Sequence, residues 1–143
     1  MGSLPSQTRE RIMPIVSIDF DGTIVRDAYP DIGEPYPGAI DAINDLYDAG
    51  YCIIINSCRA RNQECDMVRW IYLNDLKINH CNENCLELIC KYRTDCRKIS
   101  ADIYVDDKSL FAPSMENPNQ WNNIKNLILL KYGANHKRMC GKI

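Results

Sequence analysis

Apolar and polar positions alternate along the chain in blocks that predict strands and helices in turn. The β-rich run at residues 15–20 predicts a first strand. Apolar residues recur at helical spacing over 39–48, and Gly50 is placed to end that helix. Residues 51–56 contain consecutive isoleucines, which is typical of a strand buried on both faces of a sheet.

The same alternation continues to the end of the chain. A second helix is expected at 63–76, a short third strand opening at 77–79, a fourth strand at 101–105 and a closing amphipathic helix at 121–132, with Trp121, Ile124, Ile128 and Leu129 inward. Residues 22–38 predict a long loop, because their prolines and glycines exclude regular structure. The pattern predicts an α/β fold of the Rossmann-like three-layer type, with a central parallel sheet.

Length and composition indicate a single globular domain. The 143 residues are enough to bury a core, with 45% hydrophobic and 25% charged residues. We expect a mobile tail at 1–13 and one domain at 14–143. The net charge of −2 gives no electrostatic footprint for nucleic acid or membranes. Without a secretory or membrane-spanning apolar run, we expect a cytoplasmic protein.

Acidic residues follow two of the predicted strands. Asp19 and Asp21 come at the end of the first strand, and Asp106 and Asp107 follow the strand at 101–105. If these strands are neighbours in a parallel sheet, the carboxylates converge at one edge, where ligands of open α/β sheets bind. Because like charges oppose each other's ionisation, such a site favours a hard divalent cation, Mg²⁺. A carboxylate nucleophile beside Mg²⁺ suits phosphoryl transfer.

Phosphate-binding candidates lie near the same predicted edge. Ser57 and Arg59 follow the strand at 51–56, and Lys98 precedes the acidic pair. Ser57 has an alternative interpretation as a helix N-cap, and Arg59 as an exposed residue at a helix start. We also count Gly22, Thr23 and Cys58 among the candidate substrate-binding and phosphate-binding residues. Thr23 has an alternative role as a turn residue.

Together these segments resemble the haloacid dehalogenase-like (HAD) superfamily of phosphatases. Its motifs stand here in order as Asp19-Phe20-Asp21-Gly22-Thr23, Ile53-Ile54-Ile55-Asn56-Ser57, Lys98 and Ile103-Tyr104-Val105-Asp106-Asp107. Small phage-type and bacterial hydrolases of this superfamily resemble the chain most, including the stretch at 97–102. Lys91 competes with Lys98 for the third motif. No sizeable cap domain fits between the motifs, so we expect a minimal cap.

The resemblance implies a phosphatase that hydrolyses phosphate monoesters through an aspartyl-phosphate. Asp19 would be the nucleophile, and Asp21 the general acid and then base. Asp19, the Asp21 backbone carbonyl, Asp106 and Asp107 would hold Mg²⁺. Ser57 and Lys98 would bind the phosphoryl group.

The sequence leaves the substrate and several alternatives open. A small phosphorylated substrate is expected. The alternatives are a phosphotransferase or phosphomutase, a phosphatase of nucleotides or nucleic-acid ends, and a non-catalytic or regulatory binding protein. A homo-oligomer also remains open.

A second candidate metal site, separate from the acidic residues, consists of His80, Cys81, Cys85, Cys90 and Cys96. Its spacing only loosely matches a zinc site, so ordinary thiols are the expected interpretation. Cys52 lies in a strand-like run and is expected to be a small buried hydrophobe.

Overall fold

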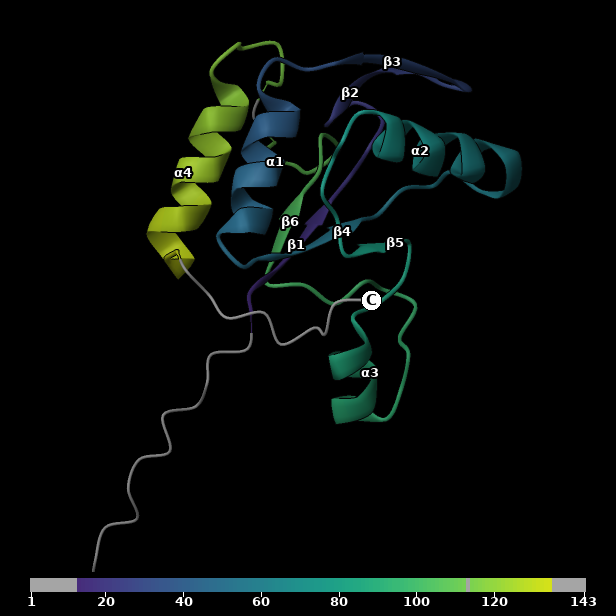
Figure 1. Cartoon of the computed structure of the whole chain (residues 1–143), viewed down its shortest axis with the longest axis vertical. Coiled ribbons are helices and arrows are strands. Elements are labelled where there is room, and N and C mark those ends of the chain that lie inside the picture. Colours follow the sequence, from purple (N-terminus) through teal and green to yellow (C-terminus); the bar gives the residue numbers. More distant parts are fainter. Residues whose placement is uncertain (1–12, 113, 135–143) are drawn as a thin grey trace, which may run out of the picture.

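The computed structural model describes residues 13–112 and 114–134 and has a central sheet flanked by helices (Figure 1). Its elements are β1 Ile15–Ile18, β2 Val25–Ala28, β3 Asp31–Pro35, α1 Ala39–Asp48, β4 Cys52–Ile55, α2 Arg61–Leu73, β5 His80–Cys81, α3 Leu86–Tyr92, β6 Ile103–Val105 and α4 Gln120–Tyr132. The central sheet has the strand order β5-β4-β1-β6, and all of its pairs are parallel. The predicted α/β class with a central parallel sheet is therefore confirmed.

The two faces of the sheet bury two separate hydrophobic clusters. Side chains alternate along a strand, so Val16 and Ile18 of β1 enter the larger cluster and Ile15 enters the smaller one. The larger cluster also takes buried residues from α1, α2 and α4. The smaller cluster is completed by Cys85 and by Leu88 of α3. The sheet therefore forms the middle layer between helices.

The first and last helices match their predicted ranges closely. α1 occupies 39–48 as expected, and α4 begins one residue earlier than expected. In α4, Trp121, Ile124 and Ile128 are buried and Leu129 packs against the larger cluster from a half-buried position. α1 and α4 lie side by side along one flank of the sheet (Figure 1).

The expectation of an irregular loop at 22–38 is wrong. Strands β2 and β3 form an antiparallel hairpin there, in which Asp27 pairs with Ile32. Gly33 does not break this hairpin but permits it, since an added Cβ would lie 2.1 Å from the carbonyl oxygen of Arg26. Pro35 is tolerated because it ends an edge strand.

Other boundaries differ from the predicted ones. The short third strand lies at β5, just after the range 77–79, and helix α3 was not predicted. α3 has no buried residue, so its sequence carries no strong apolar periodicity. Met13, placed in the tail by the sequence, is 2% exposed and packs in the smaller cluster. The rest of the predicted tail, 1–12, lies outside the described residues. No described helix is both long and apolar enough to cross a membrane.

Candidate functional site

The carboxyl ends of β1 and β6 bring three of the predicted carboxylates together. These strands are parallel neighbours with Ile18 beside Val105, so the residues that follow them emerge at one edge. The backbone N–H of Asp19 donates to the carbonyl of Val105 at 2.9 Å. Carboxylate oxygens of Asp19, Asp106 and Asp107 all lie within 4.8 Å of one another. These three residues are called the acid cluster below.

Burial and the neighbouring carboxylates raise the pKa of Asp19. Burial, a hydrogen bond with Asp107 and the charge of Asp106 raise the pKa of Asp19 from 3.8 to about 7. The backbone of Phe20 and the side chain of Thr23 donate hydrogen bonds that oppose this rise. A divalent cation among these oxygens would relieve the repulsion and favour the ionised form.

Thr23 joins the two halves of the acid cluster. Its Oγ1 donates to Oδ2 of Asp19 at 3.2 Å and accepts from the backbone N–H of Asp107 at 3.1 Å. The residue is fully buried, so its hydroxyl is used inside the protein. This geometry favours a positioning role for Thr23 over a contact with substrate.

Gly22 allows Asp107 to approach the turn after β1. Its φ is +85°, and an added Cβ would lie 2.3 Å from Oδ2 of Asp107. The other oxygen of Asp107, Oδ1, is buried and lacks a hydrogen-bond partner among the described residues. A buried carboxylate oxygen without a partner is costly. A cation would satisfy it, and an all-oxygen donor set is what Mg²⁺ prefers.

Asp21 lies outside the acid cluster because a buried arginine holds it. Arg59 is 2% exposed and donates from Nε and Nη2 to the two oxygens of Asp21, both at 2.7 Å. It also donates to the carbonyls of Pro30 at 3.0 Å and Asp31 at 2.8 Å, and lies over the Tyr29 ring. Arg59 therefore fastens the β2–β3 hairpin to the site, a role that the sequence did not predict.

Ser57 emerges at the same edge, after β4. The N–H of Asn56 donates to a β1 carbonyl at 2.8 Å, which places the following residues beside the end of β1. The Oγ of Ser57 accepts from the N–H of Arg59 at 3.1 Å, and its own N–H donates to Oδ1 of Asn82 at 2.7 Å. Cys58 is exposed. This loop is thus held in shape next to the acid cluster.

Neither candidate lysine of the third motif contacts the acid cluster in the structure. Lys98 Nζ lies 4.9 Å from the ring centroid of Tyr104. The Tyr104 hydroxyl donates to the carbonyl of Ile99 at 2.6 Å, so this ring points toward the amino end of β6 and away from the acidic edge. Lys91 Nζ lies over the ring of Tyr92 on α3.

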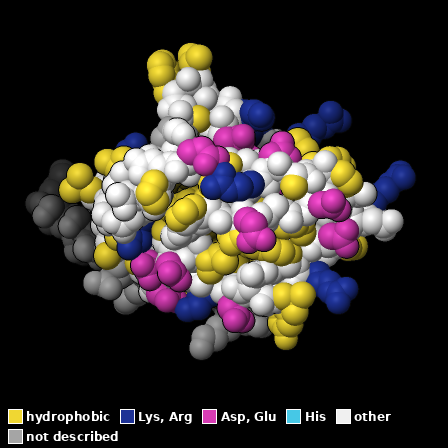
Figure 2. Space-filling view, turned by 90° about the horizontal axis from the view of Figure 1, so that it is seen from above, with side chains coloured by type: hydrophobic (Ala, Val, Ile, Leu, Met, Phe, Trp, Pro, Cys, Tyr) yellow, Lys and Arg dark blue, Asp and Glu magenta, His cyan; other side chains and the backbone are white. Residues whose placement is uncertain are grey.

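A different lysine lies at the acid cluster. Nζ of Lys108 is 3.8 Å from Oδ2 of Asp107, and the Lys108 side chain is 83% exposed. Its backbone N–H donates to Oδ1 of Asp106 at 2.8 Å. The sequence signal for it was its place directly after the acidic pair. Viewed from above, onto the end toward which β1 and β6 point, the surface mixes acidic and basic side chains (Figure 2).

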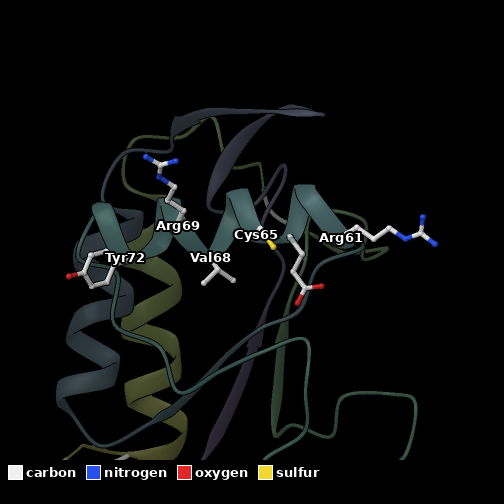
Figure 3. Close-up of a pocket in the computed structure, with 6 residues that line it drawn as sticks. Arg61, Cys65, Val68, Arg69 and Tyr72 are labelled. Atoms are coloured by element: carbon white, nitrogen blue, oxygen red, sulfur yellow. The ribbon is translucent and has the colours of Figure 1, made fainter.

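A hollow on the outer face of α2 is separate from the acid cluster. It is lined by Arg61, Glu64, Cys65, Val68, Arg69 and Tyr72, which all belong to that helix. Their side chains spread apart along the helix and do not converge on one point (Figure 3). A site that holds one small ligand needs convergent polar groups, so the acid cluster is the better candidate.

Comparisons with known proteins add support for the fold. No family model matches the chain, and no curated protein matches it significantly. A solved structure described as a conserved protein coded by a locus of Bacteroides thetaiotaomicron is similar, with a TM-score of 0.71 and 28% sequence identity. The alignment covers 83% of this chain and 92% of that one. The α/β architecture that carries the acid cluster is thus also found in a solved structure.

Proposed function

We propose that this protein is a Mg²⁺-dependent phosphatase that hydrolyses phosphate monoesters through an aspartyl-phosphate on Asp19. The observation that carries the proposal is the convergence of Asp19, Asp106 and Asp107 at the end of β1 and β6. These positions coincide with the first and fourth HAD motifs in the sequence. The resemblance and the geometry therefore support the same chemistry.

The donor set suits a hard cation. All three ligand side chains are carboxylates, and Oδ1 of Asp107 is buried without a described partner. The pKa of Asp19 is raised by burial and then by Asp107 and Asp106. Asp19, Asp106 and Asp107 would hold the ion, and the backbone carbonyl of Asp21 is the further candidate ligand. When bound, Mg²⁺ would neutralise phosphoryl oxygens and lower the barrier to attack by an anion.

The chain's own carboxylates supply the covalent steps. An oxygen of Asp19 attacks phosphorus, forming an O–P bond as the ester O–P bond breaks, and Asp21 gives its proton to the leaving alcohol. Asp21 then accepts a proton from water as that water attacks the phosphorus of the acyl phosphate. Inorganic phosphate leaves and Asp19 is restored. In the structure Arg59 donates to both oxygens of Asp21, so Asp21 would have to release Arg59 to take part in these proton transfers.

The phosphoryl group needs hydrogen-bond donors and a positive charge beside Asp19. The Ser57 hydroxyl, whose oxygen accepts from the N–H of Arg59, would supply a donor next to the end of β1. Lys108 is the proposed cation, since its Nζ already faces Asp107, whereas Lys98 lies against Tyr104. This assignment replaces the expected role of Lys98 with that of a nearer residue.

The segments that surround the acid cluster would select the substrate. The β2–β3 hairpin is the structure inserted after the first motif, and Arg59 links it to the site. Such a small cover would leave room for a small phosphorylated metabolite and equally for the phosphorylated end of a nucleic acid. The catalytic proposal is the same for both substrates.

Hydrolysis of an aryl phosphate tests the proposal. Activity is expected with Mg²⁺, and should be lost with EDTA and in Asp19→Asn. The matched control is Asp66→Asn, an exposed aspartate on α2, which should keep full activity. Activity that persists in EDTA or in Asp19→Asn would contradict the mechanism. Binding of Mg²⁺ without hydrolysis of any phosphate ester would favour the binding-protein alternative.

A further inference from the structure

Two thiols and an imidazole come together on the face of the sheet that carries the smaller hydrophobic cluster. Cys52 is the first residue of β4, His80 is the first residue of β5, and Cys85 directly precedes α3. Their ligand atoms, two sulfurs and one ring nitrogen, all lie within 4.8 Å of one another. They are called the Cys2His cluster below. The acid cluster follows the carboxyl end of β1, whereas Cys52 opens its strand.

Strand register explains why these residues meet. β4 and β5 are parallel neighbours in which Ile54 lies beside His80. Cys52 and Ile54 share one face of β4 because side chains alternate along a strand. That face belongs to the smaller hydrophobic cluster, which also contains Cys85. The sheet therefore fixes Cys52 and His80, and the turn before α3 brings Cys85 to them.

His80 has one ring nitrogen held and one buried. Nδ1 lies 3.4 Å from Oε1 of Glu83, an arrangement that favours the proton on Nδ1. Nε2 is buried and has no hydrogen-bond partner among the described residues. A carboxylate on one nitrogen and a free lone pair on the other is the usual arrangement of a histidine that binds a metal.

The dimensions and chemistry of the Cys2His cluster suit zinc. Zinc binds sulfur at about 2.3 Å and imidazole nitrogen at about 2.0–2.1 Å, so tetrahedral ligands are separated by less than about 4 Å. Separations within 4.8 Å need only a small contraction to reach this geometry. Thiolates and imidazole are soft or borderline ligands, in contrast to the all-oxygen acid cluster. Sγ of Cys85 donates to the Glu87 carboxylate. Glu87 is not among the residues whose ligand atoms all lie within 4.8 Å of one another, so its carboxylate would have to move inward to supply a fourth ligand.

We propose that Cys52, His80 and Cys85 bind a structural zinc ion, with Glu87 as the fourth ligand. The ion would fasten the segment that contains α3 to the central sheet. α3 itself has no buried residue and its Leu88 is only partly buried against the smaller cluster, so the ion would strengthen a sparse contact. The proposal does not depend on the phosphatase function, because the two sites use different residues.

Cobalt titration of reduced, metal-free protein tests the site, because a thiolate bound to Co²⁺ gives a characteristic charge-transfer absorption. We expect this absorption at one ion per chain and its removal by Zn²⁺. Cys85→Ser and His80→Gln should each weaken Zn²⁺ binding at least about tenfold, the smallest loss that even outer partners of a metal site cause. Cys81→Ser and Asp19→Asn are the controls and should bind as the wild type does, since neither residue belongs to the Cys2His cluster.

His80→Gln keeps the test decisive if the buried Cys85→Ser variant does not fold, because the imidazole is partly exposed. Zn²⁺ should also slow tryptic cleavage after Lys91 and Arg93, which lie at the end of α3. Three results would overturn the proposal: no thiolate absorption in the wild type, unchanged Zn²⁺ affinity in a folded His80→Gln variant, or a Cys52–Cys85 disulfide in place of bound metal in protein purified without reductant.

Discussion

Arg59 donates to both carboxylate oxygens of Asp21 from a position that is almost fully buried. The two residues lie 38 positions apart in the chain. This bidentate pair locks the residue proposed as general acid and base to the β2–β3 hairpin. It also keeps the Asp21 side chain out of the acid cluster.

Removing Arg59 should destabilise the protein strongly. Arg59→Met leaves the Asp21 carboxylate and the carbonyls of Pro30 and Asp31 without their donor, and breaking a buried pair in this way costs about 3–5 kcal/mol. Urea denaturation gives the free energy of unfolding. The matched control is Arg26→Met, which breaks the exposed pair with Glu116 and should cost less than about 1 kcal/mol. Equal losses for the two variants would contradict the role assigned to Arg59.

Gly22→Ala should disrupt the acid cluster. An added Cβ would meet Asp107 at 2.3 Å, and the positive φ adds strain. Gly38→Ala is the matched control, because Gly38 also has a positive φ but its added Cβ would only reach Trp121 at 3.9 Å. Calorimetric titration should show a clear loss of Mg²⁺ affinity for Gly22→Ala alone. Equal Mg²⁺ affinities would mean that the close approach of Asp107 does not matter.

Thr23→Val should lower activity and stability together. Valine keeps the shape but removes the hydroxyl between Asp19 and Asp107, which leaves a backbone N–H without its acceptor at a cost of about 1–3 kcal/mol. Thr23→Ser retains the hydroxyl and should rescue kcat. The exposed Thr94→Val is a control for the loss of a hydroxyl elsewhere. Failure of serine to restore kcat would argue against the hydrogen-bonded bridge.

The metal-free protein should lose stability as pH rises from about 4 to about 7. The pKa of Asp19 is about 7 when folded and 3.8 as the reference for the unfolded chain, so the folded state binds more protons in this window. Asp19→Asn removes this contribution, and the difference in unfolding free energy between wild type and variant isolates it. The unfolding free energy of Asp19→Asn should therefore rise relative to that of the wild type as pH rises from about 4 to about 7. A pH-independent difference would contradict the raised pKa.

Mg²⁺ should reverse the loss of stability that the metal-free protein shows at rising pH, because the ion binds the ionised carboxylates. Its stabilising effect should be largest above pH 7 and fall as pH drops through the pKa of Asp19. Thermal unfolding with and without Mg²⁺ measures this. Stabilisation that is independent of pH would place the ion elsewhere.

Lys108→Ala should reduce kcat on an aryl phosphate more than Lys98→Ala does. Lys108 faces Asp107, while Lys98 lies against Tyr104 near the amino end of β6. Steady-state kinetics of both variants decide between them. A larger loss of kcat in Lys98→Ala than in Lys108→Ala would favour Lys98 as the phosphate-binding lysine, as the order of the motifs predicts.

The strongly patterned elements were predictable because burial dictates their sequence. α1 has buried residues at helical spacing, and every residue of β4 is buried. The hairpin was missed because β2 buries only its first residue and so lacks the strand alternation. α3 was missed for the same reason, since it buries none.

The site was predictable where local sequence places a residue at a strand end. Asp19 and Asp106 follow apolar strands, and the parallel pairing of β1 with β6 brings them together. Contacts between distant segments carry no such signal, which is why Arg59 was not assigned to Asp21. Likewise, Cys52 looked like a packing residue until the pairing of β4 with β5 placed it beside His80.

The most direct test of the central claim is to trap the covalent intermediate. Asp21→Asn should still form the aspartyl-phosphate with a good leaving group, but without the general base its hydrolysis should slow by about 10²–10⁴-fold. Mass spectrometry of acid-quenched protein, incubated with Mg²⁺ and aryl phosphate, should then find one phosphoryl group on the peptide that contains Asp19. The double variant Asp19→Asn/Asp21→Asn should carry none. Turnover by the wild type without any phosphoryl-enzyme in Asp21→Asn, or a phosphoryl group that persists in the double variant, would contradict the account.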